Sequence, residues 1–508
     1  MRQKVAVLNT GTSLLYFLLK IFVSFFIRKW LIICFGVEIL GVQSVVVDTI
    51  AVLALCEMGI QSSIIYRLYV AIGQGDTDQE AQIYSIFCRL YKYVGVSIGI
   101  FGIVLLPFVG IVINTDIPIN TVRIIYVLQL GSVVLNYFLS CPRLLYIAHQ
   151  KQYKCTKYDI FFQILAYLGQ TFSIFVLNSY FIFLLCNYIT IVFSNFLLRI
   201  NLTRDFNWLK DSAVFSSKMY SRIKEDLKDI ISGNLATFIY SSTDNIILSV
   251  FFGAMRVGYI ANYKLVTGAL KSLIDTINNA LAPIWGNYLN EDHFAKQIVE
   301  VIRLYNFIIF IICYFIFVPA TCLINDFVSI WLGHEYLINS LILYLIIGDV
   351  ILNSFHQSYC MVLRSYGLFY EDKYINIVAA SINIISSIIL SIMIGEAGVF
   401  VGTIVALIWY FVSRFYVSIK KIKVSLDNVK IILKEQAIYI LFFIFSVVIC
   451  DVLVSLYDIS TSPKLIGAVI AVEAFCILLF LLCFFRHEMF KNLLEKILKP
   501  LINKKRRT

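Results

Sequence analysis

The sequence has little charge. Only 14% of its 508 residues are Asp, Glu, Lys or Arg, whereas about a quarter are charged in an average soluble domain. Hydrophobic residues make up 60% of the chain, the mean hydropathy is +0.86, and only 7 prolines interrupt the apolar runs. These values exclude an ordinary soluble protein and predict an all-α polytopic membrane protein.

Motifs for catalysis and metal binding are absent as well. The 12 cysteines form no CxxC pair, the five histidines form no HExxH, and there is no phosphate-binding loop, GxSxG or glycine-rich dinucleotide turn. This excludes a primary ATP-driven pump for this chain, and we expect no metal and no organic cofactor. Asp76-Thr77-Asp78 matches the metal-binding DxD of glycosyltransferases, but its polar surroundings (GQGDTDQE) predict a turn. Because no loop exceeds about thirty residues, we expect a transporter and not an enzyme.

The apolar residues gather in runs of about 20, each long enough to cross a bilayer as a helix. Fourteen such runs are predicted: 9–29, 42–63, 93–113, 121–141, 158–177, 180–198, 230–252, 259–283, 304–324, 337–360, 374–394, 397–417, 436–457 and 464–485. With a cytoplasmic N-terminus, 34 of the 42 basic residues lie on the cytoplasmic side. Both termini are therefore predicted to be cytoplasmic in a multi-pass plasma-membrane protein. The net charge of +11 then indicates contact with membrane lipids, not with nucleic acid.

Two short patterns recur in the two halves of the chain. FGVEILG (Phe35 to Gly41) and FGAMRVG (Phe252 to Gly258) share F-G-x4-G, and PFVGIVINTD from Pro107 is echoed by PATCLIND from Pro319. The recurrence predicts a parallel pseudo-repeat of two six-helix lobes, with a binding site at their interface. The predicted domains are lobes at 1–200 and 230–417, a basic cytoplasmic linker at 201–229, two further helices within 418–485 and a basic cytoplasmic tail at 486–508.

The run at 259–283 is apolar on one face and polar on the other. Lys264, Gly268, Lys271, Asp275 and Asn278 recur at steps of 4, 3, 4 and 3, which places them along one face of a helix. Charges at membrane depth are costly unless they face a water-filled cavity or each other, so this stripe predicts a solute pathway. The alternative is that Lys271 and Asp275 form an i,i+4 pair that holds the helix to a neighbour.

Two other runs carry polar faces. The first contains Lys20, Ser24 and Arg28 at steps of four; Lys20 lies too deep for easy snorkelling, whereas Arg28 has the alternative of reaching the outer interface. The seventh carries Asp244 at the end of a face formed with residues 234, 237 and 241. We expect these side chains to line the same cavity as the stripe.

Three acidic or titratable residues are candidates for coupling to an H+ or Na+ gradient. Asp349 and His356 share one face of the tenth run, and Glu57 lies near the inner end of the second. Carboxylates and imidazoles inside a membrane bind or release protons when burial and neighbours shift their affinity. The alternative for Asp349 and His356 is a buried polar pair that only fixes the helix register.

Three stretches resemble a known family: Phe35 to Tyr69, Ser242 to Val266, and WLGHEYL from Trp331 to Leu337. They are similar to bacterial polysaccharide or O-antigen (Wzx-type) flippases of the multidrug/oligosaccharidyl-lipid/polysaccharide (MOP) exporter superfamily. The likeness extends over essentially the whole chain and rests on diffuse hydrophobic motifs. FGVEILG departs mildly from the family's LG-x-E-aromatic-LG pattern. The resemblance implies a MATE-like fold in which two six-helix lobes surround a central cavity that opens alternately to each side.

The resemblance also implies a substrate, a polyprenyl pyrophosphate-linked oligosaccharide that is moved to the outer leaflet for surface polysaccharide (capsule or O-antigen) synthesis. Polysaccharide polymerase and assembly proteins would then be partners. The residues agree independently, because a pyrophosphate in a membrane cavity needs cations, and Lys20, Arg28, Lys264 and Lys271 supply them. Asp244 and Asp275 would orient those cations or bind sugar hydroxyls. The rival functions are a MATE-like drug exporter, which predicts a cavity dominated by carboxylates, and a membrane polymerase or glycosyltransferase of the same pathway.

Overall fold

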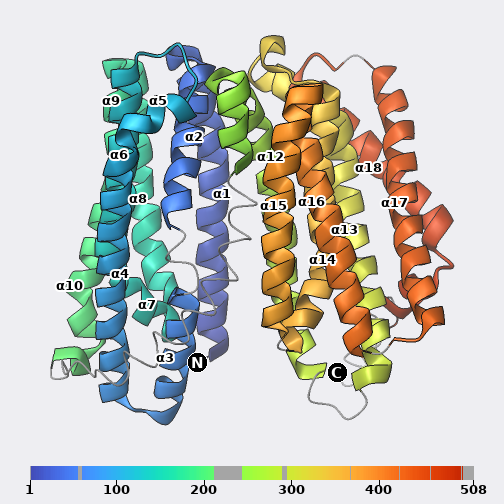
Figure 1. Ribbon diagram of the computed structural model, residues 1–508, viewed down its shortest axis with the longest axis horizontal. Coiled ribbons are helices and arrows are strands. Elements are labelled where there is room, and N and C mark those ends of the chain that lie inside the picture. The colour runs from blue at the N-terminus through green and yellow to red at the C-terminus, as the bar shows by residue number, and fades with distance from the viewer. Residues whose placement is uncertain are drawn as a thin grey trace. The chain divides into compact units, whose positions relative to one another are not determined.

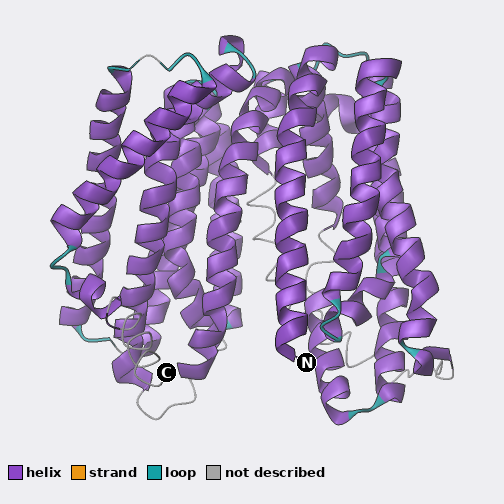
Figure 2. Cartoon of the chain, turned by 180° about the vertical axis from the view of Figure 1, so that it is seen from behind, coloured by secondary structure: helices purple, strands orange, loops and turns teal. Residues whose placement is uncertain are grey.

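The computed structural model describes residues 2–54, 60–210, 243–288 and 294–495, except for positions 367, 423, 458 and 494. The regular elements in these residues are helices, as Figures 1 and 2 show, and the predicted all-α class is confirmed. Helices suit a bilayer because they satisfy their own backbone hydrogen bonds where water is absent. The chain divides into two compact units, Met1–Ala261 and Asn262–Thr508.

The first unit consists of long upright helices joined by short turns (Figure 1). Its elements are α1 (Arg2–Phe35), α2 (Val37–Leu53), α3 (Ile60–Gln74), α4 (Thr77–Leu105), η2 (Leu106–Phe108), α5 (Val109–Val112), α6 (Ile119–Leu139), α7 (Cys141–Ala148), α8 (Gln152–Phe172), the π-helical turn η3 (Ser173–Leu177), α9 (Tyr180–Ile189), the π-helical turn η4 (Thr190–Ser194), α10 (Asn195–Asp205), η5 (Asn207–Lys210), the helix Thr243–Phe252 and the start of α12 (Ala254–Tyr288). Pro107 lies in the short 3-10 turn η2 that follows α4.

The second unit continues along α12 and is built around α13. Its other elements are α13 (Phe294–Trp331), η6 (His334–Tyr336), α14 (Ser340–Ser365), α15 (Phe369–Ile394), α16 (Ala397–Ile422), α17 (Leu426–Ser455) and α18 (Ser462–Phe484). Buried aromatic rings of α13, among them Phe307, Phe310 and Tyr314, pack against Tyr439 of α17 and Phe480 of α18. This packing attaches the two C-terminal helices to the rest of the unit.

Among the described residues, ten helices are long and apolar enough to cross a membrane, or eleven if the bent pair α1 and α2 counts as one span. A multi-pass membrane protein is therefore confirmed, but the predicted number of fourteen spans is not. The predicted run 42–63 is divided between α2 and α3, and most of 230–252 lies outside the described residues. The run 259–283 does form part of a 35-residue helix, α12, which is not among the ten because its lysines and asparagines lower its hydropathy. The domain boundaries stay a prediction.

The repeated F-G-x4-G pattern has the same local structure in both copies. Gly36 separates α1 from α2 and Gly253 precedes α12, and both have φ of +86°, a backbone conformation that favours glycine. At Gly36 the chain bends by 118° between the two helices. The equal geometry of the two glycines supports the internal repeat that the sequence predicts.

The last glycine of each copy packs against the backbone of the other copy. A Cβ on Gly41 would overlap the carbonyl oxygen of Ala254, and a Cβ on Gly258 would overlap the carbonyl oxygen of Val37. Val37 and Ala254 occupy the same position in their copies, so the contact between α2 and the start of α12 is reciprocal. Glycine is required at both places because the helices approach within backbone contact.

The DxD sequence begins a helix, whereas the sequence predicts a turn there. The carboxylate of Asp76 accepts a hydrogen bond of 2.9 Å from the backbone N–H of Gln79 and caps α4. An aspartate in this position stabilises the helix N-terminus by accepting from an otherwise unpaired amide. The geometry therefore explains Asp76 without a metal-bound sugar nucleotide.

The reciprocal glycine contact predicts a stability effect. Gly41→Ala and Gly258→Ala should each lower the free energy of unfolding by about 1–3 kcal/mol, because the added methyl group overlaps a backbone carbonyl. Gly467→Ala is the control, since no atom of another residue lies within 4 Å of its added Cβ. Thermal unfolding in detergent measures all three. The double variant should lose less than the sum of the single losses, because one displacement opens both contacts; equal melting of Gly41→Ala and Gly467→Ala would contradict the argument.

Candidate functional site

The two charges at the centre of the α12 stripe pair with each other. Lys271 Nζ lies 2.8 Å from Asp275 Oδ2, one helical turn away, and the two side chains are 37% and 50% exposed. A pair so exposed contributes little to stability, about 0.3–0.5 kcal/mol for an i,i+4 pair. The contact lies within α12, so it orients the lysine without attaching the helix to a neighbour.

The ends of the stripe differ from its centre. The amine of Lys264 lies 5.8 Å from the ring centroid of Phe400 on α16, within range of a cation–π contact. Asn278 is buried, and its Oδ1 accepts a hydrogen bond of 2.7 Å from the hydroxyl of Tyr305 on α13. Asn278 therefore belongs to a helix contact, and the open part of the stripe is shorter than predicted: it ends at Asp275.

The three predicted residues of α1, Lys20, Ser24 and Arg28, differ in what surrounds them. Lys20 is exposed and Ser24 is half-buried, whereas the guanidinium of Arg28 donates a hydrogen bond of 2.6 Å to the backbone carbonyl of Ala261 on α12. Arg28 thus contacts the backbone of α12. Ala261 precedes Lys264 by three residues on α12, so the carbonyl that Arg28 contacts lies about one helical turn from Lys264.

The polar face predicted around Asp244 is described only at its end. Asp244 lies in the first turn of the helix Thr243–Phe252, and the residues predicted to share its face, 234, 237 and 241, are outside the described residues. Beside it, Asn245 donates a hydrogen bond of 2.6 Å to Asp48 of α2. The role of Asp244 in substrate binding stays a prediction.

Two of the three candidates for ion coupling, Asp349 and His356, lie on α14. His356 of α14 is 4% exposed, and its ring stacks on Tyr410 of α16 with centroids 5.8 Å apart. In the described part of the chain, Nδ1 of His356 has no hydrogen-bond partner. Asp349 lies two turns earlier on α14 and is half-buried, and Glu57 is outside the described residues. The role of these three residues in ion coupling stays a prediction.

The other face of Tyr410 meets an ion pair. The guanidinium of Arg414 lies 4.6 Å from the Tyr410 ring centroid and donates hydrogen bonds of 2.8 Å to Asp372 and to Asn376 of α15. Arg414 is buried, and its charge is balanced by Asp372. His356, Tyr410 and Arg414 form a row from α14 to the N-terminal part of α15, which no spacing in the sequence indicates.

Two cavities lie outside the predicted stripes. In the second unit, a cavity of about 510 Å³ is lined mainly by apolar side chains of α13, α14 and α17; its members with polar groups include Thr321, Tyr344, Tyr439 and Asp451. In the first unit, a cavity of about 350 Å³ has polar and aromatic walls. Both volumes exceed about 300 Å³, the lower limit for small-molecule sites.

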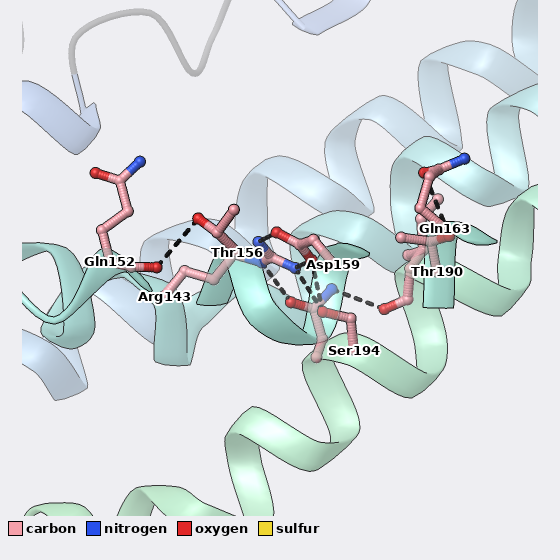
Figure 3. A network of polar contacts seen from close by, with 9 residues as sticks. Arg143, Gln152, Thr156, Asp159, Gln163, Thr190 and Ser194 are labelled. Atoms are coloured by element: carbon pink, nitrogen blue, oxygen red, sulfur yellow. Dashed lines mark hydrogen bonds and ion pairs between the residues drawn. The ribbon is translucent and has the colours of Figure 1, made fainter. Parts of the chain in front are cut away.

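The wall of the smaller cavity contains an ion pair that the sequence did not single out. Arg143 of α7 donates two hydrogen bonds, of 2.7 and 2.6 Å, to the two carboxylate oxygens of Asp159 on α8, and a third of 2.6 Å to Asn195 (Figure 3). The hydroxyl of Ser194 also donates to Asp159. The sequence did offer one signal, because Asp159 lies at the edge of the apolar run 158–177. Its partner Arg143, however, lies on α7, before the turn that leads into α8.

The sequence matches no family model and no curated protein, but solved structures do match it. The lipid II flippase MurJ in an inward closed conformation is 14% identical, with a TM-score of 0.68 over 94% of this chain and 100% of that chain. An inward-facing multidrug resistance MATE family transporter of the MOP superfamily is 13% identical, with a TM-score of 0.62 over 78% of this chain and 94% of that one. A MOP superfamily transporter from Pyrococcus furiosus, described by the reverse polarity of its binding pocket, is 14% identical, with a TM-score of 0.53 over 83% of this chain and 95% of that one. The chain therefore has the fold that flippases and transporters of the MOP superfamily share.

Proposed function

We propose that this protein is a flippase that moves a polyprenyl pyrophosphate-linked oligosaccharide from the cytoplasmic to the outer leaflet for surface polysaccharide synthesis. The observation that carries the proposal is the exposed Lys271 in the middle of a membrane-length helix, oriented by Asp275. A lysine at membrane depth costs a few kcal/mol unless it meets water or an anion. Because Lys271 is exposed, its ammonium group is accessible to a phosphate even while it pairs with Asp275.

The other cations have the same chemistry. Lys20 is exposed on α1, and Lys264 lies half-buried about two turns before Lys271 on α12. Arg28 is engaged with the backbone of Ala261, so we assign it mainly to positioning α1 against α12. A pyrophosphate carries several negative charges and is bound best by several charge-assisted hydrogen bonds. Among the similar structures, one is a lipid II flippase, which supports a lipid-linked substrate.

The mechanism we propose is alternating access. The two halves of the repeat rock about the substrate, and the polyprenyl tail stays in lipid through a lateral opening between the first and eighth spans. The apolar cavity among α13, α14 and α17 is suited to a hydrocarbon chain and supports a lipid over a water-soluble substrate. Polysaccharide polymerase and assembly proteins would act on the exported product.

A drug exporter is the second candidate, because a multidrug MATE transporter shares the fold. It would bind cationic drugs through carboxylates. The cations of the α12 stripe outnumber its one carboxylate, which favours an anionic substrate. A membrane polymerase or glycosyltransferase is less well supported, since Asp76 of the DxD sequence caps a helix.

Lys271→Ala tests the substrate assignment. In liposomes that contain a fluorescent polyprenyl pyrophosphate oligosaccharide, the variant should move the lipid about 10 to 100 times more slowly, as expected for the loss of one charged hydrogen bond of about 1.5–3 kcal/mol. Protection of the headgroup from an external probe measures the movement. Lys430→Ala, at an exposed position of α17, is the matched control.

Asp275→Asn separates this role from a structural one. If the ion pair only stabilised α12, Asp275→Asn and Lys271→Ala would lower the stability and the activity equally, and by little. We expect Asp275→Asn to insert normally and to keep most of its activity, because the lysine remains. Wild-type protein that moves no lipid-linked sugar but exports a fluorescent cationic dye would favour the drug exporter.

We further propose that transport is coupled to protons through His356, with Asp349 and Glu57 as the other candidates; a Na+ gradient is the alternative. His356→Gln should abolish the acceleration of transport by an imposed pH gradient while leaving slow uncoupled movement, because glutamine keeps hydrogen-bonding groups but does not bind a proton. His487→Gln, which alters a histidine stacked on Phe307 after α18, is the control. A variant that still responds to the pH gradient, or wild-type transport driven only by Na+, would contradict this assignment.

A further inference from the structure

The polar cavity of the first unit has a wall whose charges are already balanced. Both carboxylate oxygens of Asp159 accept hydrogen bonds from Arg143, and the remaining guanidinium donors reach Asn195 and Ser194 (Figure 3). Ser194 and Asn195 are 0% and 1% exposed, so the network is fixed in place. A pyrophosphate would have to take Arg143 from Asp159, and a cation would have to take Asp159 from Arg143. In the part of the chain that the structure describes, no three His, Cys, Asp or Glu side chains gather as metal ligands. The cavity therefore favours a neutral polar ligand.

The opening of the cavity offers groups that both donate and accept hydrogen bonds. Gln61 of α3 and Asn136 of α6 are exposed at its lining, and Ser140 and Thr190 add hydroxyl groups. The hydroxyl of Tyr91 donates a hydrogen bond of 3.4 Å to Oε1 of Gln61, which directs the amide. Amides and hydroxyls each supply a donor and an acceptor, as do the hydroxyl groups of a sugar.

Aromatic rings form the rest of the lining. Tyr91 packs against Phe87, with centroids 4.0 Å apart, and against Tyr137, with centroids 5.5 Å apart, while Tyr16 of α1 lines the cavity from another helix. Tyrosine presents an apolar ring and a polar hydroxyl, which suits a ring that has apolar C–H faces and polar edges. A sugar ring has this combination, whereas a hydrocarbon chain lacks the polar edges.

The backbone is irregular at this cavity. The π-helical turn η4 carries Thr190, Ile191 and Ser194, all of which line the cavity or belong to its hydrogen-bonded wall. A π-helical turn inserts an extra residue into a helix and is frequent at functional sites. Here it brings consecutive polar groups of the α9–α10 helix toward Asp159.

We infer that this cavity is a carbohydrate subsite that binds a neutral sugar residue. The inference rests on the proposed function in one respect: the sugar is taken to belong to the lipid-linked oligosaccharide. The site is separate in chemistry from the Lys271 stripe, since it recognises hydroxyl groups and not phosphate. A volume of about 350 Å³ sets the ligand at one or two sugar rings.

The test is saturation-transfer NMR on purified full-length protein in nanodiscs. The probes are the methyl glycosides of glucose, galactose, mannose and N-acetylglucosamine. We expect at least one to bind wild type, and Gln61→Leu and Asn136→Leu each to weaken that binding about tenfold. Gln74→Leu, an exposed glutamine at the end of the same helix α3, should bind like wild type. Thermal unfolding confirms that the variants are folded.

The outcomes distinguish this inference from the proposed function. Lys271→Ala should bind the glycoside like wild type and yet fail to move the lipid-linked oligosaccharide. Binding of the glycosides without any lipid movement by wild type would support the subsite and contradict the flippase. Lipid movement by wild type without binding of any of the four glycosides would overturn the subsite alone. Equal binding by wild type, Gln61→Leu and Asn136→Leu would also overturn it.

Discussion

Every charge inside a bilayer needs a partner or water, and this requirement accounts for where the ionised residues of this chain lie. Arg143 pairs with Asp159, Arg414 with Asp372, and Arg303 with Glu435 and Glu488. Each of these pairs joins two helices and is largely shielded, except for the exposed Glu488. Lys271 and Asp275 break this pattern, because they pair within one helix and remain open. The pairs between helices therefore stabilise the packing of those helices, whereas the pair within α12 leaves its charges open.

The close approach of α2 and α12 depends on a different constraint, the absence of side chains at Gly41 and Gly258. The repeated F-G-x4-G pattern is visible in the sequence, but the contact between its two copies is seen only in the structure. The all-helical class and most spans could also be predicted, since apolar length decides them. The span count could not be confirmed: α2 ends at Leu53 within a continuous apolar run, and hydropathy does not detect such an end.

The candidate site was predictable only in part. Helical spacing placed Lys264, Lys271 and Asp275 on α12 correctly, but it gave Asn278 the same role, and Tyr305 of the neighbouring helix takes Asn278 out of the open face. The Arg143–Asp159 network was missed because its members come from three helices whose contacts no local pattern encodes. The same holds for the row from His356 to Arg414. Periodicity assigns a residue to a face, but packing decides what that face meets.

A lipid-linked oligosaccharide has a charged part and a neutral part, and the two candidate binding surfaces match them separately. Cations give strong, long-range attraction to phosphate, whereas amides and hydroxyls give weaker, direction-dependent hydrogen bonds. A transporter has to release its substrate, so recognition of the sugar by several weak bonds provides selectivity without a slow dissociation rate. The Arg143–Asp159 pair contributes to this by holding the polar wall rigid while keeping its own charges away from the ligand. A free arginine in that wall would bind phosphate and compete with Lys271, and the bidentate aspartate removes this competition.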